Sequence, residues 1–440
     1  MAGESDAAEQ IQRDDARQYK LLPHIRCPHC WLRFRSSEIV WVARHEELRG
    51  DLVLGGDYFV RFRPSRFNVA GEALDARGMS CQTLACPRCH LVIPLAFLEC
   101  EPLIFSLIGV MASGKSYFLA AMTWELRQML KSRFGLVFTD ADAVGNQILN
   151  DYEKMLFLQA DLDQLVALRK TELQGDLYDI INLEGQQASL PRPFLFTMRP
   201  SAEHPSAAAA EVLSRIICLY DNAGEHFQPD PNMDSLTAPG TQHLARARIL
   251  MFLFDPTQDP RTRDLCKNVS GDPQLFEKAR TERQALILTE AVLRVRRHAG
   301  LAPNRKLDKP LLVLVSKADI WSQLIDEDLR VEPHVARGRL PTLVDTGRIE
   351  AVSAKVRKFL MTQVPEFVTV AEDACKSVTY IPVSALGCSP EPLTVGTGLG
   401  IRPKDIAPRW VTVPMLYSFA RWSTSLVEAT NGSAAAPPEA

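Results

Sequence analysis

The amino-acid sequence predicts an α/β protein with a mainly parallel sheet, preceded by a small β-rich module. From Pro102 onward, apolar runs of strand length alternate with long helical patterns, which is typical of β-α units. Between Leu22 and Glu101, short β-type runs alternate with Gly and Pro instead. A length of 440 residues also exceeds what one hydrophobic core usually serves. Two modules are therefore expected.

Polar tails bound the two modules. Residues 1–22 are polar and acidic, and residues 431–440 carry too little apolar content to pack into a core. We expect the β-rich module over 23–101 and the α/β domain over 102–430. A long helical region at about 146–182 is expected as an insertion near the start of that domain.

The β-rich module carries two near-identical cysteine turns, C-P-H-C at 27–30 and C-P-R-C at 86–89. Each turn can aim two thiolates at one point, and two such turns complete a tetrahedral Cys₄ shell around Zn²⁺. A closed Cys₄ site leaves no open position for chemistry, so the zinc is expected to be structural. The predicted ligands are Cys27, Cys30, Cys86 and Cys89, with Cys81, His24, His29 and His90 as possible substitutes.

The same module contains a basic and aromatic run, R-F-R-P-S-R-F at 61–67. Such a run could bind single-stranded nucleic acid through stacking and phosphate contacts. A half-exposed strand with solvated arginines is the favoured interpretation, so a nucleic-acid partner is an alternative here and not the main expectation.

In the α/β domain, strands are expected at apolar runs and helices at runs with helical periodicity. The expected strands are 103–108, 193–197, 216–220, 249–254, 311–315 and 378–383. The expected helices are at about 116–132, 276–298, 347–362 and 414–428.

A phosphate-binding loop follows the first of these strands. The run L-I-F-S-L-I leads into G-V-M-A-S-G-K-S at 109–116, and a helical run follows directly. The two glycines let successive backbone N–H groups converge on a phosphate, to which the new helix adds its positive end. We expect Lys115 to reach the β- and γ-phosphates and the Ser116 hydroxyl to bind Mg²⁺. The residues expected at the nucleotide here are Gly109, Ala112, Ser113, Gly114, Lys115, Ser116 and Tyr117.

Two further strand ends carry groups suited to a guanine nucleotide. The strand at 216–220 ends in Asp221, whose carboxylate can hold the Mg²⁺ shell, and Gly224 can bring a backbone N–H to the γ-phosphate. The strand at 311–315 runs into S-K-A-D, where Asp319 can accept hydrogen bonds from the N1–H and 2-amino groups of guanine. Adenine offers a lone pair at that position and would leave a buried carboxylate unpaired.

Other residues complete the expected base site. The stem of Lys317 would lie along the plane of the base. The last strand ends in S-A-L-G, so the backbone of Ser384 and Ala385 could approach guanine O6. An ATPase with a coincidental S-K-A-D is the alternative, which nucleotide competition would distinguish.

The runs G-V-M-A-S-G-K-S, D-N-A-G-E, S-K-A-D and S-A-L-G, in that order, resemble the G1, G3, G4 and G5 motifs of translation-factor-related (TRAFAC) P-loop GTPases. The resemblance covers about three quarters of the chain. It implies a three-layer α/β fold with a mainly parallel sheet, GTP and GDP as ligands, Mg²⁺ as cofactor and GTP hydrolysis. The cysteine module and the insertion before G3 are similar to bacterial double-GTPase families associated with conflict or defence gene clusters.

Three departures from the GTPase motifs bear on hydrolysis. Ser316 stands where the G4 motif usually has Asn or Thr, which weakens one orienting hydrogen bond. Glu225 replaces the water-orienting glutamine and His226 follows it, so these two residues and Lys115 are the catalytic candidates. The switch I threonine has no clear equivalent, and the candidates are Thr171 and Ser189.

These features together predict a GTP-binding and GTP-hydrolysing regulatory switch that is slow without a partner. Positive charge for the transition state would come from Arg246 or Arg248, or from a protein partner. The alternative is a nucleotide-binding scaffold with little turnover, which recruits a protein or nucleic-acid partner through the zinc ribbon.

Composition agrees with a cytoplasmic protein that does not enter a membrane. Hydrophobic residues make up 46% and charged residues 23%, and a net charge of -3 gives no overall attraction to nucleic acid or anionic lipid. The N-terminal segment lacks the basic start and apolar run of a signal peptide. Two carboxylates interrupt the most apolar stretch, 91–111, and would be costly in lipid. The ten cysteines show no disulfide pattern, so a reducing compartment is expected.

Overall fold

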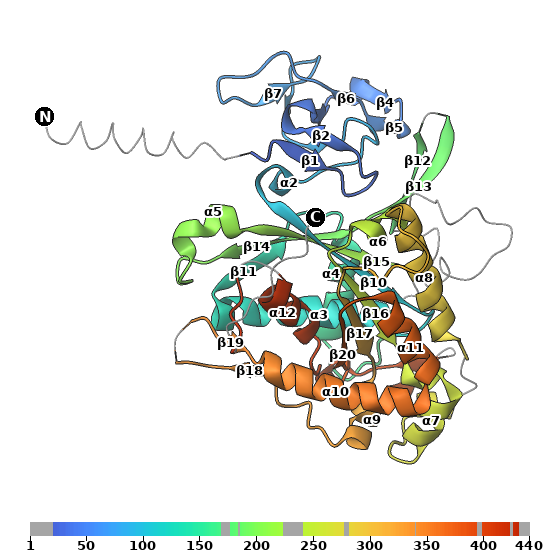
Figure 1. Cartoon of the computed structure of the whole chain (residues 1–440). Helices are drawn as coiled ribbons and strands as arrows, with labels where there is room; N and C mark the ends of the chain where they lie inside the picture. The colour runs from blue at the N-terminus through green and yellow to red at the C-terminus, as the bar shows by residue number, and fades with distance from the viewer. Residues whose placement is uncertain are drawn as a thin grey trace, which may run out of the picture. The chain divides into compact units, whose positions relative to one another are not determined.

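The computed structural model separates the chain into two compact units (Figure 1). One unit contains the residues up to Pro102 together with Ile181–Gln187, and the other contains Leu103–Ile180 and the residues from Ala188 onward. The structure describes residues 21–168, 177–183, 185–222, 241–276, 281–338, 340–393, 398–422 and 426–430. Nearly all of the predicted tails therefore lie outside the described residues.

The first unit is built from short antiparallel strands. Its strands are β1 (His24–Arg26), β2 (Arg33–Arg35), β3 (Val40–Val42), β4 (Arg49–Asp51), β5 (Gly55–Phe59), β6 (Arg61–Phe62), β7 (Ala73–Leu74), β8 (Ser80–Cys81) and β9 (Leu84–Ala85), followed by the helix α2 (Ala96–Glu99). Strand β3 lies between β6 and β9, while β1–β2, β4–β5 and β7–β8 form separate pairs. Buried Ile25, Phe34 and Ile93 contribute to a small core.

A seven-stranded, mostly parallel sheet forms the centre of the second unit, in the order β11-β14-β15-β10-β16-β17-β20. The pairs β10–β16, β16–β17 and β17–β20 are parallel, whereas β14 is antiparallel to both β11 and β15. The strands are β10 (Glu101–Gly109), β11 (Leu136–Asp140), β14 (Phe194–Pro200), β15 (Arg215–Asp221), β16 (Ile249–Phe254), β17 (Leu311–Val315) and β20 (Val378–Pro382). Each of the six predicted strands is present, and β11 is an edge strand that the sequence did not reveal.

Helices cover both faces of this sheet. They include α3 (Lys115–Met129), α4 (Gln147–Phe157), α5 (Ala210–Leu213), α6 (Gln242–Arg246), α7 (Pro260–Lys267), α8 (Gln284–His298), α9 (Ala318–Trp321), α10 (Thr346–Gln363), α11 (Pro365–Ala374) and α12 (Val413–Trp422). Phe419 of α12 packs on Phe105, with ring centroids 6.2 Å apart, and Phe367 of α11 packs on Phe252 at 5.3 Å. Phe105 is aligned with Ile249, and neighbouring residues of a strand face opposite sides. The two helices therefore lie on opposite faces, which makes three layers.

The predicted helical region at 146–182 is wrong over much of its length. Among the described residues of this region, only Gln147–Phe157 is an α-helix, and Tyr178–Leu183 is the strand β12, which pairs with β13 (Gln186–Pro191). The β-branched side chains of Ile180 and Ile181 favour a strand. The helix expected to reach residue 428 also ends earlier, at Trp422, and Ala429 forms a β-bridge with Val344 instead.

In the part of the chain that the structure describes, no helix combines the length and the apolar character that a bilayer span requires.

Candidate nucleotide site and cysteine cluster

The phosphate loop connects β10 to α3 as the sequence order predicted. Strand β10 ends at Gly109, and α3 begins at Lys115. A side-chain carbon on Gly109 would lie 2.9 Å from the backbone oxygen of Leu253 on the neighbouring strand, so only glycine fits there. Gly114 has a φ of +91°, which places it in the left-handed region at the helix start. Both glycines of the motif are therefore required by the backbone.

Lys115 folds back over this loop. The side chain is buried, and its Nζ atom donates hydrogen bonds to Gly109 O at 3.1 Å and Val110 O at 2.9 Å. The Ser113 hydroxyl donates to Val110 O at 2.9 Å, which tightens the turn. A lysine cation and the N-terminal end of a helix thus meet at the loop, where both favour a phosphate group.

Asp221 ends the neighbouring strand β15 and is almost fully buried. Burial raises the pKa of its carboxyl group to about 6, against the opposing effect of the Lys115 charge. Among the described residues, nothing donates a hydrogen bond to its Oδ1 atom. An orphaned carboxylate oxygen beside a phosphate loop has the chemistry of a Mg²⁺ ligand, so Asp221 and the Ser116 hydroxyl could hold Mg²⁺.

The base end of the site follows β17. Lys317 has a left-handed backbone, with φ of 53°, and its Nζ atom donates to Asp255 Oδ2 at 2.8 Å and Thr257 Oγ1 at 2.9 Å. Gln258 Nε2 in turn donates to Met111 O at 2.9 Å in the phosphate loop. The polar residues after β16 therefore tie the base loop to the phosphate loop, and no sequence motif had pointed to them.

Asp319 is the acceptor at this end. Its Oδ1 atom accepts a hydrogen bond from the Ser384 hydroxyl, and Ser384 Oγ accepts one from Gly387 N at 2.8 Å. Burial raises the pKa of the Asp319 carboxyl group, with the Ser384 bond acting in the opposite direction. The Ser316 hydroxyl is buried and has no hydrogen-bond partner among the described residues. Ser316 thus gives no orienting bond of the kind an Asn side chain makes.

One cavity of about 420 Å³ joins the two ends. This volume lies within the range of small-molecule sites, about 300 to 1,000 Å³. Of the predicted nucleotide residues, those that line it are Ala112, Ser113, Gly114, Tyr117, Lys317, Asp319, Ser384 and Ala385. Gly109, Lys115, Ser116 and Asp221 lie at its phosphate end, within or beside the loop. Gly224, Glu225, His226 and Thr171 lie outside the described residues.

Sequence reasoning missed part of the cavity wall. Gln274 and the segment 399–401 also line it. Ile401 is held there by two backbone hydrogen bonds with Val166, of 2.8 and 2.9 Å. These residues come from connections without a recognisable motif, so only the tertiary structure brings them to the site.

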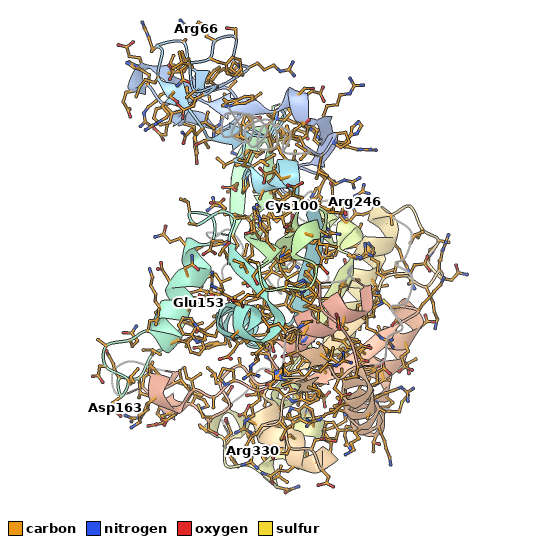
Figure 2. The ribbon with its side chains drawn as sticks, turned by 90° about the vertical axis from the view of Figure 1, so that its left-hand side faces the viewer. Arg66, Cys100, Glu153, Asp163, Arg246 and Arg330 are labelled. Atoms are coloured by element: carbon orange, nitrogen blue, oxygen red, sulfur yellow. The ribbon has the colours of Figure 1, made fainter. Side chains whose placement is uncertain are left out.

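The structure contradicts the prediction that Arg246 or Arg248 supplies positive charge to the phosphate site. Both precede β16, and Arg248 N donates to Ile104 O, near the start of β10, at 3.0 Å. The phosphate loop follows the other end of β10, where Gly109 is aligned with Leu253. Leu253 is five positions further along the strand than Arg248, a distance of about 16 Å. Arg246 (Figure 2) lies at the same remote edge of the sheet.

In the first unit, the two cysteine turns have the same backbone conformation. In each turn the first cysteine N–H donates to a carbonyl five residues later, Cys27 to Leu32 O and Cys86 to Leu91 O. Trp31 and His90, which follow the turns, have φ of 64° and 61°. Backbone N–H groups also donate to the first sulfur of each turn, from His29 at 3.4 Å and from Arg88 at 3.4 Å. The structure therefore contains a pair of equivalent knuckles.

The four cysteine sulfurs form a compact cluster. The Sγ atoms of Cys27, Cys30, Cys86 and Cys89 all lie within 4.8 Å of one another, with Cys27–Cys89 at 3.6 Å and Cys30–Cys86 at 3.7 Å. A tetrahedral site with Zn–S bonds of about 2.3 Å has edges of about 3.8 Å, so these thiols fit Zn²⁺. The same separations are far too long for disulfide bonds. Burial raises the pKa of the Cys27 thiol well above its ordinary value, so a cation is needed to stabilise the thiolate form.

Three of the four possible substitute ligands, His29, His90 and Cys81, are engaged elsewhere. His29 Nε2 lies 3.2 Å from Val92 O, and His90 Nδ1 lies 2.8 Å from the Asp51 carboxylate. Cys81 Sγ donates to Met79 O at 3.5 Å. Arg61 is also occupied, because its guanidinium group donates to the carbonyls of His90 and Phe59. Arg61 thus stabilises the first unit through hydrogen bonds to its backbone.

The fold and the cavity define an α/β protein with a phosphate-binding loop at one end of a cavity that a nucleotide would fit. No protein-family model matches the chain. Over 272 residues the sequence is 25% identical to a Mycolicibacterium smegmatis protein whose name describes a candidate ESX-1 scaffolding and assembly protein, SaeC. The match covers 57% of this chain and 63% of that relative, so the chain spans less than two thirds of its length.

Solved structures with similarity to the chain include three nucleotide complexes. They are translation elongation factor SelB of Methanococcus maripaludis with a GTP analogue (9% identity, 65% of this chain and 30% of that one, TM-score 0.22), Era of Aquifex aeolicus with GDP and aluminium fluoride (12%, 65% and 52%, 0.22) and the GTPase-like domain of S. cerevisiae Ski7 with GTP (12%, 68% and 48%, 0.24). At such TM-scores these similarities carry no weight for function, which rests on the chain's own residues.

Proposed function

We propose that this protein is a GTP-binding switch that hydrolyses GTP slowly. The observation that carries the proposal is the single cavity that extends from the phosphate loop to the Asp319 carboxylate. The cavity has a loop that favours phosphate at one end and a half-buried carboxylate acceptor at the other, which match the two ends of a nucleoside triphosphate.

The acceptor at the base end favours guanine. Guanine presents two donors, N1–H and the 2-amino group, along one edge, and the half-buried Asp319 carboxylate can accept from both. Adenine presents an acceptor at the equivalent position, so the carboxylate would lose water without gaining a hydrogen bond. Phosphate affinity comes from Lys115 and the loop N–H groups, with Mg²⁺ on Asp221 and Ser116.

Hydrolysis is the part of the proposal that depends most on partners. In phosphoryl transfer the protein mainly positions the reactants and stabilises negative charge. Glu225 and His226 are the proposed water-orienting residues, and an ionised Glu225 beside the γ-phosphate would slow the reaction. The zinc ribbon would stabilise the first unit and offer a surface for a protein partner, and we place the protein in the cytoplasm.

A scaffold with little turnover is the second candidate. The observation that favours it is the M. smegmatis relative, whose name describes scaffolding and assembly. In this alternative the nucleotide sets the conformation in which a partner is bound, and turnover is incidental. A role in bacterial conflict or defence, as in double-GTPase families, is the narrower form of the switch proposal.

Nucleotide analysis and competition test the proposal. The purified protein is stripped of nucleotide and loaded with a fluorescent GDP analogue, which is then displaced by GTP, ATP or ITP in the presence of Mg²⁺. We expect GTP to displace it at far lower concentration than ATP. Equal displacement by ATP would contradict the guanine assignment. Single-turnover GTP hydrolysis then separates the switch from the scaffold.

A further inference from the structure

A buried polar cluster lies behind the phosphate site in the second unit. Ser106, Asn222 and His243 are 0%, 1% and 0% exposed, and they come from β10, from the residue after β15 and from α6. Their surroundings are apolar, and buried polar groups are costly unless they are hydrogen-bonded. Such a cluster therefore needs internal partners, and it has them.

Hydrogen bonds connect the three residues of this cluster. Asn222 Nδ2 has two hydrogens and donates them to Ser106 Oγ at 3.1 Å and to Leu107 O at 2.8 Å. Ser106 Oγ also lies 3.0 Å from His243 Nδ1, in a hydrogen bond whose direction depends on the His243 tautomer. A chain of hydrogen bonds thus links Asn222 through Ser106 to His243.

The cluster joins segments that matter for the Mg²⁺ site. Asn222 directly follows Asp221, and its backbone N–H also donates to Leu107 O at 3.3 Å. Ser106 and Leu107 lie on the strand that leads into the phosphate loop at Gly109. His243 additionally stacks on Tyr220, the residue before Asp221, with ring centroids 4.6 Å apart and planes 5° from parallel.

The residues on both sides of Asp221 are therefore clamped, Tyr220 by ring stacking and Asn222 by three hydrogen bonds to β10. Asp221 itself has an Oδ1 atom without a hydrogen-bond partner among the described residues. The contacts of Tyr220 and Asn222 thus fix the backbone that carries this carboxylate.

We infer that Ser106, Asn222 and His243 are positioning residues that hold the Asp221 carboxylate toward the phosphate loop, so that it can bind Mg²⁺ together with the nucleotide. The inference rests on the proposed guanine-nucleotide function. It assigns to the cluster a role in metal affinity, beyond its contribution to core packing.

The test measures how Mg²⁺ slows the release of a fluorescent GDP analogue from the full-length protein. Ser106→Ala removes the central hydroxyl, and His243→Phe keeps a ring that can stack on Tyr220 but removes the nitrogen that hydrogen-bonds Ser106. We expect each variant to raise the Mg²⁺ concentration for half-maximal slowing about threefold to tenfold, as the loss of one buried hydrogen bond predicts. Release in EDTA should stay within twofold of wild type, because the cluster acts through the metal.

Ser418→Ala is the matched control. Ser418 is also 0% exposed and also loses one hydrogen bond, from its hydroxyl to Pro414 O at 2.6 Å, but it lies on α12 outside the cluster. Melting temperatures of all variants are measured in EDTA. If Ser106→Ala and His243→Phe change the melting temperature or the release rate in EDTA but leave the Mg²⁺ midpoint at the wild-type value, the positioning role is overturned. If wild type shows no Mg²⁺-dependent retention of GDP, the proposed function itself fails.

Discussion

Replacing Asp319 with alanine is expected to abolish the preference for GTP. The half-buried carboxylate lines the cavity, and its Oδ1 atom accepts a hydrogen bond from the Ser384 hydroxyl. A carboxylate has about four lone-pair positions, so it can serve Ser384 and still accept two hydrogens from guanine. Hydrogen bonds to a charged group are worth about 1.5 to 3 kcal/mol each.

Because Asp319 Oδ1 already accepts from Ser384, each hydrogen bond to guanine should contribute a free energy near the lower end of that range. Two bonds of about 1.5 to 2 kcal/mol correspond to a loss of about 10²- to 10³-fold in GTP affinity. ATP affinity should stay the same or rise, because the variant no longer buries an unpaired carboxylate beside adenine. ITP lacks the 2-amino group, so wild type should bind it about tenfold more weakly than GTP.

The assay is displacement of a fluorescent GDP analogue at equilibrium, with GTP, ITP and ATP as competitors. Asp328→Ala is the control, since this carboxylate pairs with Arg330 at 2.9 Å on the surface and does not line the cavity. The reasoning is refuted if Asp319→Ala still prefers GTP over ATP, or if ITP and GTP bind wild type equally.

Four other outcomes are expected. Lys115→Ala should weaken triphosphate binding about 10- to 100-fold, because its ammonium group supplies charge-assisted hydrogen bonds to phosphate. Replacing Cys27 and Cys30 with serine should reduce zinc from one ion per chain to near zero, measured by metal analysis, with nucleotide affinity within twofold of wild type. Burial raises the pKa of Glu332 from 4.5 to about 7, so its ionised form opposes folding above pH 7. At pH 8.5, Glu332→Gln should therefore raise the melting temperature and increase the free energy of unfolding by up to about 3 kcal/mol. Below pH 4.5 it should leave the melting temperature unchanged. GTP turnover should be slow, should rise with protein concentration or an added partner, and should not change in Arg246→Ala.

Each of these has a result that would contradict it. Unchanged triphosphate affinity would exclude Lys115 from phosphate binding, and full zinc retention in the double cysteine variant would exclude the Cys₄ site. For Glu332, the exposed Glu350 offers a matched Glu350→Gln control, and an equal gain at low and high pH would show that ionisation is not the cause. Fast turnover that is independent of concentration would point to a self-contained catalytic residue.

Most of the central sheet could be predicted because its strands are buried on both faces. Ile249–Phe254 and Leu311–Val315 are apolar throughout, and their observed ends coincide with the expected ones. Where helices cover both sides of a strand, every residue must be apolar, so the run begins and ends where the strand does. The edge strand Leu136–Asp140 has only one buried side, and its mixed pattern gave no comparable signal.

The candidate site could be predicted only where a motif is local in sequence. The phosphate loop and the acceptor after β17 depend on contiguous residues, and the structure places them at one cavity. Gln274 and Ile401 reach the same cavity through long connections, whose path depends on contacts such as the Val166–Ile401 bridge. Neither residue type nor spacing encodes such a path in a single sequence.

Arg246 and Arg248 illustrate how nearness in the chain can mislead. They follow the predicted switch segment closely, yet a parallel strand order returns the chain to the opposite edge of the sheet before β16 begins. Among the described residues that line the cavity there is no arginine, and Lys317, its lining lysine, is paired with Asp255 at 2.8 Å. Lys115 is then the cation that the described phosphate site itself provides. Additional positive charge for the transition state must come from the residues beyond the described part of the site or from a partner, which is why turnover should depend on concentration.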